Sequence, residues 1–290
     1  MKEYKLFTDS TSDLPYDIVK RLDIEVIPTE VILKGKGYLD YPDERELNKR
    51  DFYRQVREGE MPTTAVIPPN RFYEYFEKEL KEGRDILYIV FSSGLTTTLQ
   101  NAKIAAAELK EVYPEGRIAL VDSLSGSLGE GLLVYYAAEM RQEGKSIDEI
   151  EEWVKANRLK LCHWFTVDDL QHLRRGGRVT AASAVVGGVL SIKPILNVSD
   201  EGRLEPVEKV RGRKAALETL LDKIKKGAVK PEEQTIFIIH ADCEEECMWL
   251  KAEVEKHVGP KEIFIAFMGP VVGAHAGPGA IGLVFIGEHR

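Results

Sequence analysis

The first half of the chain alternates short apolar runs with segments whose apolar positions recur at helical spacing. Three of the apolar runs end in polar turns rich in Ser, Thr, Asp or Gly, and a helix-like segment follows each turn. Three strand–turn–helix units in series favour a parallel, doubly wound sheet, because parallel strands need crossover helices. The predicted strands are residues 4–9, 86–91 and 117–121, a further strand and small hairpin cover 25–39, and the predicted helices are residues 16–22, 49–57, 70–81, 99–110 and 132–143.

The second half has a different pattern, in which hairpin signals mix with helices. Residues 193–208 are a predicted hairpin whose turn is Asp200-Glu201-Gly202. The pattern favours an α+β domain with a mixed or antiparallel sheet. The predicted fold class is therefore α/β with two domains, residues 1–146 and residues 147–290. The other predicted strands are residues 160–166, 235–240, 262–268 and 282–287, and the predicted helices are residues 147–157, 167–173, 213–226 and 244–257.

One segment between two predicted helices contains three prolines, Pro62, Pro68 and Pro69. Proline has no backbone N–H to donate to a sheet, and its ring disrupts a helix interior. Residues 61–69 are therefore predicted to be a loop that belongs to neither a helix nor a strand ladder.

The composition of the chain argues against several classes of function. The chain has 290 residues, 43% apolar and 30% charged, which suits one or two globular domains. Its net charge of −8 argues against nucleic acid as a partner. No signal peptide or membrane-spanning run is expected, and the longest uncharged apolar stretch, residues 179–190, is interpreted as tight internal packing. Three cysteines are too few for a disulfide framework and favour a reducing cytoplasm.

The most informative stretch follows the apolar run 86–91. Residues 92–98, Ser-Ser-Gly-Leu-Thr-Thr-Thr, place five hydroxyls at a helix start, where free N–H groups and the helix dipole attract anions. Because no lysine or metal ligand lies nearby, a modest anion such as a carboxylate is favoured over a triphosphate. The alternative is that these hydroxyls are ordinary helix caps. We expect the turns after Asp9, Phe91 and Val121 to share one sheet edge, where ligands of such sheets bind.

A second candidate is His275, which small residues flank on both sides. An exposed imidazole in such a setting can donate a hydrogen bond to an anion or act as an acid or base. The alternative is a histidine that is hydrogen-bonded in a loop for structural reasons only. Residues 277–282 match G-x-G-x-x-G, but they precede a strand and no helix follows, so a dinucleotide site is disfavoured.

Other chemistry has weaker support. Chain order leaves open a hydrolase that uses Ser93, His275 and either Asp9 or Asp122, although no G-x-S-x-G elbow occurs. His240, Cys243 and Cys247 resemble metal ligands, but no second pair is spaced to complete a tetrahedral site. Buried thiols are the alternative. The basic clusters 174–178 and 211–214 are either solvated helix ends or a docking face for an acidic partner or a phosphate.

Taken in order along the chain, these motifs resemble the DegV family, the fatty-acid-binding proteins of the FakB type. The resemblance covers essentially the whole chain. It is carried by Thr8-Asp-Ser-Thr-Ser-Asp-Leu-Pro15, Pro62-Thr-Thr64, Ser92-Ser-Gly-Leu-Thr96, Asp122-Ser with Gly129-Glu-Gly131, Leu173-Arg-Arg-Gly-Gly-Arg178, Lys193-Pro-Ile-Leu196, Arg211-Gly-Arg213 and His275-Ala-Gly-Pro-Gly279.

The resemblance implies two α/β domains with one long-chain fatty acid between them, its tail buried and its carboxylate at the mouth. The implied carboxylate contacts are Thr64, Ser93, Thr96 and His275. The family's usual Thr-Ser-Gln-Pro pattern is absent at residues 64–67, so one hydroxyl is missing at Ala65, and whether Thr63 replaces it is open.

The resemblance also implies a partner. A separate ATP-dependent fatty-acid kinase would convert the bound acid to an acyl phosphate, with Arg178 and Arg211 serving that encounter. No cofactor, no metal and no complete active site of its own are then expected, and the chain would act as a lipid-binding carrier. The alternative is a serine-type esterase or acyl-transfer enzyme that uses Ser93 and His275.

Overall fold

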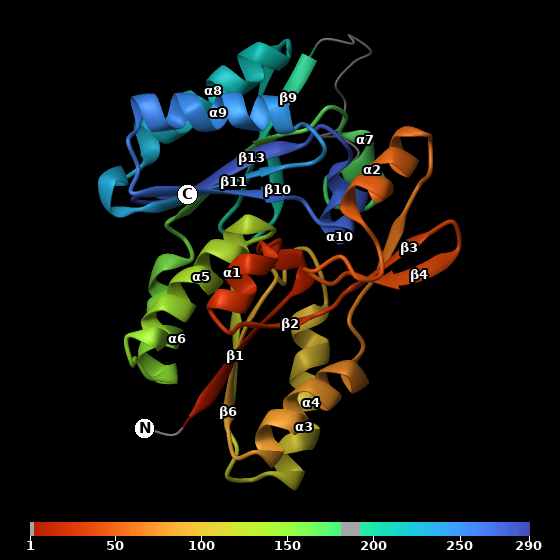
Figure 1. The fold of residues 1–290 in the computed structure, drawn as a ribbon, viewed down its shortest axis with the longest axis vertical. Helices are drawn as coiled ribbons and strands as arrows, with labels where there is room; N and C mark the ends of the chain where they lie inside the picture. The colour runs from red at the N-terminus through yellow and green to blue at the C-terminus, as the bar shows by residue number, and fades with distance from the viewer. Residues whose placement is uncertain (1–2, 181–191) are drawn as a thin grey trace.

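The computed structural model describes residues 3–180 and 192–290. It contains a parallel sheet and a separate mixed sheet, as the pattern predicts (Figure 1). Most of the apolar segment 179–190 lies outside the described residues, so its interpretation as internal packing stays a prediction. So does the division of the chain at residue 146.

The parallel sheet is built from the strand–turn–helix units of the first half. All its strand pairs are parallel, and every residue of the central strand β6 is buried, because helices cover both faces. Its strands, in spatial order, are β2 (Glu25–Ile27), β1 (Tyr4–Asp9), β6 (Asp85–Val90) and β7 (Ile118–Asp122). The 3₁₀ turn η1 (Ser10–Ser12) follows β1, and the helices of this half are α1 (Tyr16–Arg21), α3 (Pro69–Lys81), α4 (Thr98–Val112), α5 (Leu128–Gln142) and α6 (Ile147–Asn157).

The mixed sheet occupies the other side of the molecule. Only the β11–β12 pair is parallel, and the other strand pairs are antiparallel. Its strands, in spatial order, are β10 (Leu204–Arg211), β9 (Ile192–Val198), β8 (Leu161–Thr166), β13 (Ile281–Ile286), β11 (Thr235–His240) and β12 (Glu262–Phe267). Its helices are α7 (Gln171–Arg175), α8 (Arg213–Gly227), α9 (Glu244–His257) and α10 (Pro270–Ala276), and η2 (Pro231–Glu233) is a 3₁₀ turn.

Helix α5 joins the two sheets. It contacts β6 of the parallel sheet and β8, β11 and β13 of the mixed sheet. Ten of its fifteen residues are buried, as expected for a helix that is packed on more than one face. A single apolar cluster therefore runs from the parallel sheet through α5 to the mixed sheet. On the far side of the mixed sheet, α8 and α9 cover a second cluster (Figure 1).

The prediction for residues 61–69 is wrong, because Thr63–Ala65 is strand β5. It pairs antiparallel with β3 (Glu30–Leu33), which also pairs with β4 (Lys36–Leu39), beside helix α2 (Lys49–Arg57). The prolines bound this strand and do not interrupt it. Pro62 precedes β5, and Pro69 occupies the first turn of α3, where the missing N–H costs nothing.

Two helix predictions and one assumed loop also need correction. The helix predicted at 167–173 is α7, which begins only at Gln171, because the Asp169 carboxylate accepts the Gln171 backbone N–H and forms a turn there. Helix α5 begins at Leu128, four residues before the predicted start. The segment carrying His275 is the short helix α10 and not a loop. Small residues allow α10 to pack closely: a side chain at Gly273 would collide with Tyr53.

Candidate functional site

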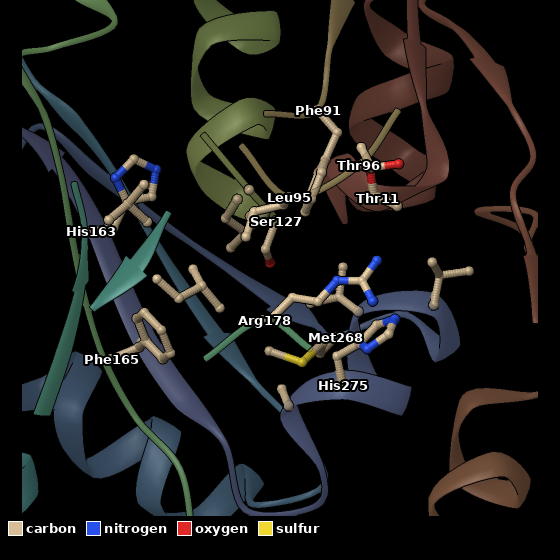
Figure 2. A pocket seen from close by; sticks show the side chains of 18 of the residues that line it. Thr11, Phe91, Leu95, Thr96, Ser127, His163, Phe165, Arg178, Met268 and His275 are labelled. Atoms are coloured by element: carbon tan, nitrogen blue, oxygen red, sulfur yellow. The ribbon is translucent and has the colours of Figure 1, made fainter. Parts of the chain in front are cut away.

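A cavity of about 570 Å³ lies where the carboxyl ends of the parallel strands face the mixed sheet (Figure 2). The turns after β1, β6 and β7 all contribute to its wall, through Thr11, Leu95 and Ser127 among others. The mixed sheet supplies β8 and β13, and α10 closes one side. The three turns therefore do meet at one edge, as expected from the sheet topology. A hydrogen bond of 2.5 Å between Ser93 Oγ and Asp122 Oδ2 links two of them.

Most of the wall is apolar. Leu173 of α7, Phe165 of β8 and Met268, which follows β12, contribute large side chains. Figure 2 shows Met268 grouped with Arg178 and His275, while Phe165 and His163 lie on the opposite side of the view. Arg178 and His275 therefore lie on one side of the cavity, and on the other side β8 contributes Phe165 together with the buried His163. The size of the cavity falls within the range of small-molecule pockets.

The polar side is built around a hydrogen bond between Thr64 and His275. Thr64 Oγ1 lies 2.9 Å from His275 Nε2. Strand β5 brings Thr64 here, since its register with Val31 of β3 turns alternate side chains of β5 towards α10. Gly176 leaves room for the imidazole, because a Cβ at that position would collide with His275 Nδ1. A strand from the first half and a helix from the second half therefore meet at this contact.

His275 is a neutral hydrogen-bonding group at physiological pH. Burial, and secondarily the positive charge of Arg178, lower the pKa of its imidazole from the usual 6.5 to about 4. A neutral imidazole keeps one donor and one acceptor nitrogen. His275 can therefore take part in a hydrogen bond with Thr64 and with a ligand, but it supplies no charge there.

The charge in this wall comes from Arg178. It lines the cavity, and its guanidinium donates to the Gly176 carbonyl. Burial lowers the pKa of Arg178, and among the described residues no carboxylate lies within ion-pair distance of it. A half-buried cation without a counter-ion produces a positive potential beside Thr64 and His275. The basic motif 174–178 thus directs one of its arginines into the cavity, while Arg174 and Arg175 are exposed.

Ser93 and Thr96 line the same cavity but are already engaged. Ser93 Oγ donates to Asp122, and Thr96 Oγ1 lies 2.9 Å from Thr98 Oγ1. The hydroxyl proton of Ser93 points at a carboxylate, so Ser93 offers only acceptor lone pairs to anything else. The five hydroxyls of residues 92–98 are therefore not equivalent, and Thr97, the N-cap residue of α4, makes no side-chain cap hydrogen bond.

Two of the predicted site residues lie elsewhere. Thr63 is exposed and does not line the cavity, because it neighbours Thr64 on the strand and points to the opposite face of β5. Arg211 is exposed at the end of β10 and is also absent from the wall. The geometry does not favour Thr63 as a substitute for the hydroxyl missing at Ala65.

The hydrolase and metal alternatives find little geometric support. His275 Nε2 contacts Thr64 and not Ser93, so the Ser93–His275 pair of the hydrolase alternative is not assembled. Within residues 3–180 and 192–290, no group of three or more His, Cys, Asp or Glu side chains is placed to hold a metal ion. Burial raises the pKa of Cys243 to about 11 and that of Cys247 to about 12, as expected for buried thiols.

A comparison with known proteins identifies the family. A family model described as the DegV family of uncharacterised proteins matches residues 3–288. A DegV domain-containing protein of Clostridium perfringens is 46% identical over 290 residues, which is 100% of this chain and 99% of that protein. The chain belongs to the DegV family. A DegV domain-containing protein of Caldanaerobacter subterraneus is 35% identical, over 98% of this chain and 99% of its own length.

Solved DegV structures share the whole fold. A DegV family protein of Thermus thermophilus, described as binding fatty acid, is 33% identical with a TM-score of 0.89, over 99% of this chain and 100% of its own. DegV of Bacillus subtilis, described as a fatty-acid-binding protein, is 30% identical with a TM-score of 0.86 over the same shares. In the described part of this DegV chain, no helix has the length and apolar character needed to cross a bilayer.

Sequence reasoning missed most of the apolar wall of the DegV cavity. Met268 is distant in the chain from Phe165 and Leu173, and nothing in their local patterns distinguishes a cavity wall from an ordinary core. Arg178 carried a usable signal. It follows two glycines, Gly176 and Gly177, and such flanks indicate a close approach by another group, here the His275 ring.

Proposed function

We propose that this DegV chain binds one long-chain fatty acid in the cavity between its two sheets. The carboxylate would lie against Thr64, His275 and Arg178, and the tail would extend towards Phe165. The single observation that carries this proposal is the form of the cavity. It is large and mainly apolar, and its one charged lining side chain among the described residues is a cation without a counter-ion.

The tail would supply most of the affinity. Removing a chain of about sixteen carbons from water contributes about 0.8 kcal/mol for each buried CH₂. The head group would contribute orientation more than net energy, because its contacts replace hydrogen bonds to water. In this arrangement Thr64 and the neutral His275 give directional contacts, and Arg178 gives the opposite charge.

The proposed biological role is to present the bound acid to a separate ATP-dependent kinase in the cytoplasm. An oxygen of the carboxylate would form a bond to the γ-phosphorus of ATP, and ADP would leave, which yields an acyl phosphate. Arg178 could then hold the new phosphoryl group, and the exposed Arg211 could contact the partner. This proposal does not retain Ser93 and Thr96 as head-group contacts, because both hydroxyls already have partners.

Denaturing extraction of the purified protein, followed by mass spectrometry, tests the binding step. We expect about one fatty acid per chain, either retained from the host cell or acquired from a mixture of fatty acids. The variant Phe165→Arg, which places a charge in the cavity wall, should lose the lipid, whereas Ile104→Arg, at an exposed position of α4 outside the cavity, should keep it. An empty wild-type protein after incubation would refute the proposal, and turnover of an acyl ester would instead favour the esterase.

A further inference from the structure

The segment that leads from β12 into α10 is held by four side chains from the first 53 residues. Two of these side chains donate hydrogen bonds to backbone carbonyls, and the other two, both carboxylates, accept hydrogen bonds from backbone N–H groups. Lys49 Nζ lies 3.0 Å from the Phe267 carbonyl, the Tyr53 hydroxyl 3.2 Å from the Met268 carbonyl and Asp13 Oδ1 2.7 Å from the Gly269 nitrogen, and Asp40 accepts from the Val271 N–H.

The two carboxylates converge on Gly269. A Cβ there would lie 2.9 Å from Asp13 Oδ1 and 3.0 Å from Asp40 Oδ2, so a side chain would displace one of them. Both carboxyl groups are buried, at 4% and 6% exposure, beside the buried Lys49. Burying three ionisable groups is costly unless their mutual geometry is well satisfied. We call the group of Asp13, Asp40, Lys49 and Tyr53 the α10 clamp.

The clamp holds the start of α10, whereas His275 lies in the last turn of the helix. Val271 and His275 are one helical turn apart, and both line the cavity. Because α10 has only seven residues, its N-terminal anchoring determines where its last turn lies. The hydrogen bond from His275 to Thr64 closes the other end.

We propose that Asp13 and Asp40 are positioning residues, which fix α10 and thereby set the place of His275 relative to Thr64 and to the head group of the ligand. This inference rests on the proposed fatty-acid binding for its functional meaning, but the positioning itself can be measured without a ligand. Neither carboxylate lines the large cavity, so their effect on the ligand is transmitted through α10.

The charge of Asp13 and Asp40 determines which substitutions test their positioning role. Burial is the main cause that raises the pKa of Asp13 and of Asp40 to about 7. The groups facing Asp13 are Ser127, the Gly269 N–H, Lys49 and Asp40, and those facing Asp40 are Lys49, the Val271 N–H, Glu44 and Asp9. An asparagine at either position keeps an acceptor oxygen without the charge. An alanine removes the acceptor, so the two substitutions separate positioning from charge.

The first readout is the pKa of His275, followed by NMR in the ligand-free protein. In Asp13→Ala and Asp40→Ala, α10 should loosen, and the pKa of His275 should rise from about 4 towards its usual 6.5 as the ring gains water. Asp13→Asn and Asp40→Asn should restore the low value. Asp222→Ala, which removes an exposed carboxylate of α8, is the matched control and should change nothing.

The second readout is head-group selectivity, the affinity for a fatty acid divided by that for the fatty alcohol of the same length. The alanine variants should lower this ratio by about tenfold, the effect of losing one charge-assisted contact. Tyr53→Phe removes one clamp hydroxyl at nearly constant volume, and it serves as the test if the alanine variants do not fold. It should lower the ratio by about threefold.

An unchanged His275 pKa in the folded Asp13→Ala and Asp40→Ala variants would overturn the positioning role. An unchanged selectivity ratio in variants that bind lipid would overturn its functional part. Failure of the wild-type protein to bind any fatty acid, with the His275 pKa still responding to the clamp, would refute only the proposed function.

Discussion

Two groups of hydroxyls face the same cavity, and they differ in what they are bonded to. In the turn after β6, Ser93 donates its proton to the Asp122 carboxylate. Across the cavity, Thr64 contacts a neutral histidine, and beside them lies the half-buried Arg178, which has no counter-ion among the residues that the structure describes. The Asp122 carboxylate would repel a carboxylate ligand from Ser93, whereas Arg178 would attract it towards Thr64. A high density of hydroxyls is therefore not enough to identify an anion site. Whether the hydroxyls can bind an anion depends on the groups to which they are already hydrogen-bonded.

The largest effect in this comparison is expected from Arg178. Arg178→Gln keeps polar character but removes the cation, so the affinity for a fatty acid should fall by about thirtyfold, or about 2 kcal/mol. Titration with a fluorescent fatty acid measures this change. Arg211→Gln, an exposed arginine outside the cavity, is the control and should bind with unchanged affinity. Equal losses in the two variants would contradict a local role for Arg178.

The next effect concerns pH and His275. Its pKa in the folded protein, about 4, is lower than its usual 6.5, so the stabilisation it gives is present above pH 6.5 and is lost as the pH falls towards 4. After allowance for partial exposure, this amounts to about 1.5 kcal/mol.

Denaturant unfolding of the wild type and of His275→Gln, at several pH values in that range, measures the difference between the two free energies of unfolding. Glutamine does not titrate, so the wild type should lose more stability than the variant. If the free energies of unfolding of the two proteins fall equally as the pH is lowered, His275 is not desolvated in the folded protein.

A smaller effect is expected at Thr64. Thr64→Val preserves shape and removes the hydroxyl, so the fatty-acid affinity should fall by about fivefold, the value of one ordinary hydrogen bond. Isothermal titration calorimetry with acid and alcohol ligands shows whether the loss is specific to the head group. Thr63→Val alters the neighbouring hydroxyl, which faces away from the cavity, and should have no effect. If Thr63→Val is the more damaging change, β5 has the opposite register in solution.

The smallest effect is expected at Ser93. Because its proton is already donated to Asp122, Ser93→Ala should change fatty-acid affinity by less than about twofold. The same titration serves here, with Thr96→Val as a companion variant on the same turn. A loss as large as that of Arg178→Gln would reverse the comparison and place the carboxylate at the β6 turn.

Local patterns predicted much of this fold. The alternation in the first half indicated β1, β6 and β7 with their turns on one edge, and the Ser93–Asp122 contact follows from that topology. Strand β5 was missed, because prolines forbid pairing only at the positions they occupy, and they flank this strand.

The site was predictable only in part. Thr64, Ser93, Thr96, His275 and Arg178 all line one cavity. The sequence does not reveal that the Ser93 proton is donated to Asp122, or that Arg178 has no carboxylate partner among the described residues. Those properties depend on Asp122 and on the packing of α10, which come from distant parts of the chain. The apolar wall could not be predicted from the sequence for the same reason, since the local patterns around Met268 and Phe165 are those of ordinary core residues.

The most direct test of the account is a crystal structure of this protein with a bound fatty acid. We predict electron density for one acyl chain in the cavity, with its carboxylate within hydrogen-bond distance of Thr64, His275 and Arg178 and its tail directed towards Phe165. A carboxylate placed at Ser93 and Asp122, or a cavity that stays empty at saturating fatty acid, would contradict it.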